Sequence, residues 1–128
     1  MSIKTEISVG EFLDKLSILQ IKQDRIKEAA KLVNINREIE TLMTLWAGSA
    51  YCSSGIGAEK EQLRQVNEQL WDIEDDIRAK EAKGEFDSEF VRLARAVYIT
   101  NDRRARIKKK INEKVDSGLT EEKSYKDY

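Results

Sequence analysis

Hydrophobic residues recur at helical spacing along most of the chain, and these stripes predict four helices. Ser8-Val9-Gly10-Glu11 is typical of a capping box, in which the serine and the glutamate satisfy free amides at a helix start. The predicted helices span about 9–31, 34–47, 58–83 and 88–116, with a turn around "KLVN" between the first two. Their apolar positions are Phe12, Leu16, Leu19 and Ile26, then Ile35, Ile39 and Leu42, then Leu63, Val66, Leu70, Ile73 and Ile77, and finally Phe90, Val97, Ile111 and Val115.

The stretch "GSAYCSSGIG" (48–57) is poor in helix formers and predicts a loop that divides the helices into two pairs. Gly84 ends the third helix, so the third and fourth should form an antiparallel hairpin about 40 Å long. The expected fold is all-α, a four-helix bundle-like single domain over 1–128. The polar tail, 117–128, is expected to dock its tyrosines on the bundle.

The composition of the chain excludes several kinds of catalytic and metal site. The chain has no histidine and one cysteine, Cys52, which excludes Ser-His-Asp triads, Cys-His pairs and the common zinc sites. The metal chemistry that the composition leaves possible is Mg²⁺ or Ca²⁺ held by carboxylates. No cofactor is expected, except Mg²⁺ under the enzymatic alternative described below. Cys52 cannot form an internal disulfide, and no apolar run is long enough to span a membrane. We therefore expect a cytoplasmic protein with no membrane partner.

The phrase "LWDIEDDIR" (70–78) places four carboxylates in one short stretch. At 100° per residue they spread around a helix instead of converging, so the stretch predicts a solvated face. Glu74 is different because it borders the apolar side and lies four residues before Arg78, a favourable spacing for an ion pair.

The last helix carries polar residues within its apolar stripe, at Asn101, Arg104 and Lys108. The expected hairpin register places Arg104 opposite Asn67. The sequence therefore predicts an interhelical polar patch of Asn67, Glu74, Tyr98, Asn101, Arg104 and Lys108. Buried polar groups need partners, so the patch is either a self-satisfied network or a pocket that binds an anionic ligand such as a phosphorylated small molecule.

Two isoleucines of the first helix lie away from its main stripe. With Phe12 at 0°, Ile18 and Ile21 fall at about 240° and 180°. They predict an oligomer interface, and hence a homo-oligomer. The alternative is that this helix is covered on both sides within one chain.

Two acidic pairs permit an enzymatic alternative, a Mg²⁺-dependent phosphohydrolase of the all-α nucleotide pyrophosphohydrolase type. Glu11 and Asp14 share one helix, and Asp72 and Asp75 share another, with the i, i+3 spacing that could clasp a metal. The pattern is weak because the chain has 24 acidic residues and Asp14 is expected on the side away from the core.

The segment "RRARIKKK" (103–110) holds six bases. They are spread around the helix, so we do not expect nucleic acid as a partner, and pairing with an acidic segment is the preferred interpretation.

Four phrases, "SVGEFLDKLSILQIK", "LWDIEDDIR", "RAVYITNDRRARIKKKIN" and "EEKSYKDY", resemble those of a family of small bacterial and phage proteins known only as a domain of unknown function. The resemblance implies no activity, so no catalytic residue is predicted from it. We expect a non-catalytic protein that binds a protein partner or a small anionic ligand.

Overall fold

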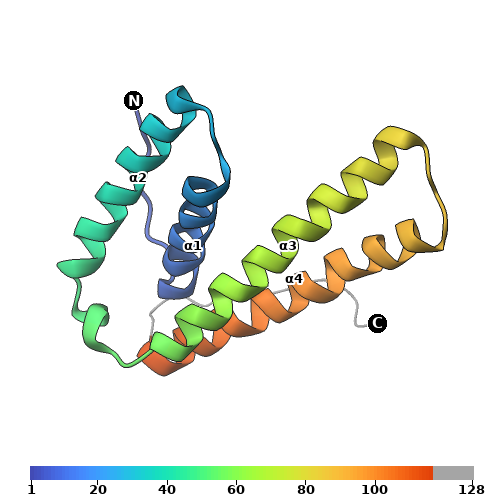
Figure 1. Ribbon diagram of the computed structural model, residues 1–128. Coiled ribbons are helices and arrows are strands. Elements are labelled where there is room, and N and C mark those ends of the chain that lie inside the picture. Colours follow the sequence, from blue (N-terminus) through green and yellow to red (C-terminus); the bar gives the residue numbers. More distant parts are fainter. Residues whose placement is uncertain (117–128) are drawn as a thin grey trace.

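The computed structural model describes residues 1–116 as four α-helices and one short 3-10 turn, with no β-strand in that range (Figure 1). The elements are α1 (Val9–Arg25), α2 (Ala29–Ala47), η1 (Ala50–Ser53), α3 (Gly57–Lys83) and α4 (Ser88–Val115). The predicted all-α bundle with a long C-terminal hairpin is confirmed. The tail at 117–128, including the predicted docking of its tyrosines, lies outside the described residues. Among residues 1–116, every helix is too short or too polar to cross a membrane.

The predicted boundary between the first two helices is wrong. α1 ends at Arg25, Ile26 is extended, and α2 begins at Ala29, so "KLVN" is helical instead of a turn. The apolar spacing continues across the break, which hid it from sequence reasoning. The early turn lets α2 fold back along α1 and bury Ile35, which is 8% exposed.

The α3–α4 hairpin is closed by local signals that the sequence displays. Gly84 ends α3 with a positive φ of 67°, a conformation that favours glycine. Asp87 caps α4 by accepting a hydrogen bond from the Phe90 amide at 3.0 Å. Lys80 binds Glu85 at 3.0 Å and Asp87 at 2.9 Å across the turn. Figure 1 shows this end of the hairpin projecting away from α1 and α2.

α1 is the central helix, because it packs on α2, α3 and α4 (Figure 1). The core lies where the start of α1 meets the start of α3 and the end of α4. Its buried members are Val9, Leu13, Ile56, Leu63, Val66 and Ile111. Ile21 is 1% exposed. The prediction that Ile21 lies on an oligomer interface is therefore corrected, since α1 is covered on both sides within one chain.

Gly10 is a point of close approach between α1 and α4. A Cβ there would lie 2.6 Å from the Lys108 carbonyl oxygen and 3.0 Å from Asn112 Oδ1. The Gly10 amide donates a 2.7 Å hydrogen bond to Asn112 Oδ1. This bond satisfies one of the free amides at the start of α1.

We expect Gly10→Ala to lower the free energy of unfolding by about 1–3 kcal/mol, because the added methyl group meets backbone that cannot move aside. Gly57→Ala is the matched control, because a Cβ on Gly57 would have no neighbour within 4 Å. The control should be neutral or stabilising by up to about 1 kcal/mol. Urea unfolding of both variants measures the difference, and equal values would contradict the close approach.

Glu59 joins the start of α3 to the end of α4. It is 3% exposed and accepts a 2.7 Å hydrogen bond from Lys114 Nζ. This hydrogen bond lowers the pKa of Glu59 below its ordinary value, with further contributions from the backbone and from the charges of Lys114 and Lys110, against desolvation. Because the pKa is lowered on folding, the ionised Glu59 stabilises the fold above about pH 4.3, the usual pKa of an unfolded glutamate.

We expect the stability lost in Glu59→Gln to be largest at neutral pH and to shrink as the pH falls below about 4.3 towards the lowered pKa of the native carboxyl. Urea unfolding between pH 3 and 7 tests this expectation. Glu61→Gln, on the exposed side of the same helix, is the control. A pH-independent difference between Glu59→Gln and the native protein would show that the charge plays no part.

Candidate functional site

Asp14 of α1 is the centre of a polar network between α1, α3 and α4. Its side chain is 1% exposed. Arg104 of α4 binds both carboxylate oxygens, through Nε to Oδ1 at 2.9 Å and through Nη2 to Oδ2. Asn67 of α3 donates to Asp14 Oδ1 at 2.9 Å and lies 3.4 Å from Ser17 Oγ. The buried carboxylate is therefore bound in the bidentate manner that suits arginine.

A second ion pair extends the network towards the surface. Lys108 Nζ lies 2.5 Å from Glu11 Oε2 and 3.9 Å from Asp14 Oδ2. Arg104 Nη1 lies 3.5 Å from Asn101 Oδ1. Two carboxylates thus face two cations, and the formal charges of the four side chains cancel. We call Glu11, Asp14, Ser17, Asn67, Asn101, Arg104 and Lys108 the polar network.

The structure brings together part of the patch predicted from the sequence. Asn67, Asn101, Arg104 and Lys108 meet as expected. Glu74 does not belong to the network, and its inclusion is corrected. The Glu74 side chain is 43% exposed and pairs with Arg78 at 3.3 Å, the predicted i, i+4 partner.

Tyr98 is 44% exposed, and its membership of the patch stays a prediction. On a helical projection it falls about 80° from Lys108, whereas Arg104 falls within about 40° of Lys108. The sequence-based register was correct for the hairpin, but it gave no information on where α1 packs.

Asp14 was missed as a network member because it was expected on the outer side of its helix. In the structure that side faces the α3–α4 hairpin, so Asp14 is enclosed. Ile21 carried the available signal: it lies seven residues after Asp14, on the same side of the helix, and is 1% exposed. A second apolar stripe on a helix predicts a second covering surface, and a charged residue in that stripe then needs a buried partner.

The four carboxylates of the predicted metal site are not brought together. Glu11 and Asp14 bind Lys108 and Arg104, whereas Asp72 is 61% exposed and binds Arg25 at 2.5 Å. Asp75 is exposed on α3. Within residues 1–116 there is no cluster of three or more acidic, histidine or cysteine side chains that could hold a metal ion.

A cavity of about 190 Å³ lies beside the polar network, between α1 and α2. Its charged lining is balanced, with three acids and three bases, and Ile18 forms part of the wall. The lining residues are Glu11, Asp14, Lys15, Ile18, Leu19, Lys22, Glu38 and Arg104. An anion entering here would compete with Asp14 for Arg104, so the cavity offers little net positive charge.

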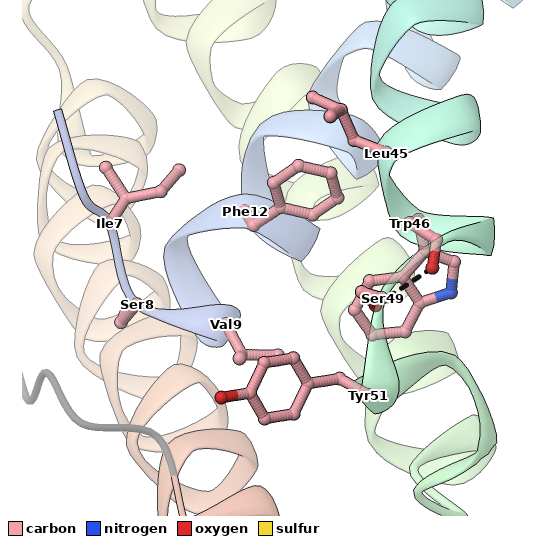
Figure 2. Close-up of a pocket in the computed structure, with 8 residues that line it drawn as sticks. All are labelled: Ile7, Ser8, Val9, Phe12, Leu45, Trp46, Ser49 and Tyr51. Carbon is pink, nitrogen blue, oxygen red and sulfur yellow. Dashed lines mark hydrogen bonds between the residues drawn. The ribbon is translucent and has the colours of Figure 1, made fainter. Parts of the chain in front are cut away.

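A second pocket, of about 140 Å³, opens between the start of α1 and the end of α2 (Figure 2). We call it the apolar pocket. Phe12 and Trp46 stack within it, with ring centroids 5.9 Å apart, and Tyr51 closes one side. The lining residues are Ile7, Ser8, Val9, Phe12, Leu45, Trp46, Ser49 and Tyr51.

The rim of the apolar pocket is hydrophobic and open to solvent. Leu45 is 59% exposed, Ile7 44% and Tyr51 37%. Lys60 Nζ lies 5.4 Å from the centroid of the Trp46 ring, which places a positive charge at this end of the bundle. Sequence reasoning missed this pocket because three separate segments build it, and their packing was not predictable from periodicity.

Removing either partner of the Asp14–Arg104 pair tests the polar network. We expect Arg104→Met to lower the free energy of unfolding by about 3–5 kcal/mol, because it leaves a buried carboxylate without its main partner. Asp14→Leu should cost less, because Arg104 is 29% exposed and can turn to water. The double variant should be more stable than the sum of the two losses implies, by about 0.5–3 kcal/mol in urea unfolding. Additive losses would mean that the two side chains act independently.

Comparison with known proteins adds one finding. No curated protein and no solved structure matches the chain. One family model does match, over residues 3–128, and its description is a family of unknown function, DUF6165. That range includes α1, α3 and α4 and therefore every residue of the polar network. The chain belongs to the family of unknown function DUF6165.

Proposed function

We propose that this protein is a non-catalytic interaction module that binds a segment of another protein in the apolar pocket. The observation that carries the proposal is the cluster of exposed hydrophobic side chains around an open pocket, on a chain in which 37% of residues are charged. Single exposed hydrophobic residues are ordinary on protein surfaces. A group of them that lines a concave site is typical of a binding surface.

The size and charge of the pocket specify the partner. A volume of about 140 Å³ accommodates one bulky side chain, such as leucine or phenylalanine, and not a longer apolar stretch. Lys60 adds a positive charge beside Trp46. The partner is therefore a segment with one large apolar residue flanked by acidic residues.

The alternative functions have less support from the geometry. Binding of a small anion, including a phosphorylated molecule, would have to separate Arg104 and Lys108 from the carboxylates that already bind them. The Mg²⁺-dependent phosphohydrolase would need Asp72 and Asp75 to face Glu11 and Asp14. The predicted homo-oligomer interface of Ile18 and Ile21 lacks Ile21, because that residue is buried within the chain. A cytoplasmic location stays part of the proposal, supported by the single exposed thiol of Cys52.

Short acidic peptides with one central leucine or alanine test the proposed function. Trp46 reports binding by fluorescence in a Trp71→Phe background, which leaves one tryptophan. We expect the leucine peptide to bind about 10–100 times more tightly than the alanine peptide, since burying one such side chain is worth about 1.5–3 kcal/mol. Lys60→Gln should remove the preference for acidic over neutral flanks.

Leu45→Ser and Val33→Ser form a matched pair of variants. Both residues are exposed on α2, at 59% and 56%, but only Leu45 lines the pocket. Leu45→Ser should weaken binding of the leucine peptide, and Val33→Ser should leave that binding unchanged. Equal affinities for both peptides, or equal effects of both variants, would contradict the proposal. A native dimer that Leu45→Ser converts to a monomer would assign the pocket to a second copy of this chain instead.

A further inference from the structure

The structure divides the bases of α4 into two groups. Arg104 and Lys108 turn inward to the carboxylates of Asp14 and Glu11. The other bases of "RRARIKKK" are exposed. In the sequence, the six bases were spread around the helix, and this spread argued against nucleic-acid binding. Two of the six, Arg104 and Lys108, form ion pairs within the chain and so account for part of the spread.

Most of the exposed bases of α4 align on one side of the helix, whereas the exposed Lys109 falls outside that side, at about 100° from Lys108. With Lys108 as the inward reference, five bases fall between about 140° and 220°, which is the opposite side of the helix. They are Arg92, Arg95, Arg103, Arg106 and Lys110, all exposed, and we call them the basic face. From Arg92 to Lys110 the face is about 27 Å long, with neighbouring charges separated by three to eight residues along one helix.

The α3 side of the basic face carries a row of glutamines together with one carboxylate, Asp76, whose charge contributes, after Glu89, to the raised pKa of Arg92. Gln62, Gln65 and Gln69 are exposed and share one side of α3. Arg103 donates a hydrogen bond to Gln69, which places this glutamine row next to the basic face. Amides accept and donate hydrogen bonds without repelling an anion.

A shallow groove of about 480 Å³ follows the same side of α4, and Arg92, Arg95 and Arg103 contribute to its walls. The face also has carboxylates beside it, because Arg92 binds Glu89 and the exposed Glu113 falls at about 140°, three residues after Lys110. The face therefore combines a line of cations, a neighbouring row of amides and a groove, on the side of α4 turned away from α1.

We propose that the basic face binds the phosphodiester backbone of a nucleic acid. Four of its five bases are arginines, whose planar forks suit phosphate oxygens. A line of like charges binds a polyanion strongly because neutralised phosphates release their counterions. An acidic protein would bind the basic face less strongly than a nucleic acid, because exposed ion pairs contribute only about 0–1 kcal/mol each. Ile99 is the one large apolar residue at the centre of the face, too little for insertion into a membrane.

The basic face is a different surface from the apolar pocket, and nucleic-acid binding there does not depend on the pocket. The test uses the full chain and fluorescein-labelled 20-nucleotide single-stranded RNA, single-stranded DNA and duplex DNA, with fluorescence anisotropy in 50–200 mM KCl. We expect the logarithm of the association constant to fall linearly with the logarithm of the KCl concentration. The slope should be about −3.5 for single strands or −4.5 for duplex DNA if all five bases contact phosphates. The ratio of the slopes distinguishes the two forms of backbone.

Arg95→Gln with Arg106→Gln should reduce the magnitude of the slope by about 1.4–1.8, which corresponds to two lost phosphate contacts. Arg37→Gln with Arg78→Gln is the control, since it removes the same charge from exposed positions on α2 and α3. Circular dichroism verifies that both double variants fold. The proposal is overturned by absence of binding at 50 mM KCl, by equal effects of the two double variants, or by polyglutamate displacing the labelled strand as well as unlabelled nucleic acid does.

Discussion

The bidentate contact between Asp14 and Arg104 determines how the rest of the structure is arranged. It joins the first helix to the last, and a buried carboxylate tolerates no position of α4 in which the arginine is absent. Asn67 binds the same carboxylate, so α3 is fixed in the same register. Apolar packing alone allows helices to slide by a turn at modest cost. A central ion pair with a neighbouring amide does not allow such sliding, and this is the specificity that we attribute to the polar network.

Close backbone packing adds a second constraint at the same end of the molecule. Gly10 brings the start of α1 against the Lys108 carbonyl, and Asn112 accepts a hydrogen bond from its amide. At the same contact, the Lys108 side chain forms an ion pair with Glu11, the residue after Gly10. The start of α1 is therefore positioned by sterics, a cap and charge together. One wall of the apolar pocket is built on this fixed segment.

The sequence was sufficient for the features that local rules determine. Ser8, Gly84 and Asp87 are capping signals, and the structure uses all three. The stripes predicted the hairpin and its register, and therefore the meeting of Asn67 with Arg104. Local rules were insufficient where a tertiary contact decided the outcome. Ile26 continues an apolar stripe, yet the helix stops before it because α2 gains more by packing on α1. Asp14 was misplaced for the same reason, since periodicity indicates which sides are apolar but not which element covers them.

The position of α2 has a consequence for the energetics of the whole fold. α3 and α4 pack on each other and on α1, whereas α2 packs mainly on α1 and η1. Ile35 is its one buried residue. Stability is unevenly distributed in such an arrangement, and the element with the fewest buried contacts opens at the lowest free energy. α2 is therefore an outer layer that can separate as a unit while the other three helices keep their polar network intact. Leu45 and Trp46 belong to this layer, so separation of α2 would open the apolar pocket along one side.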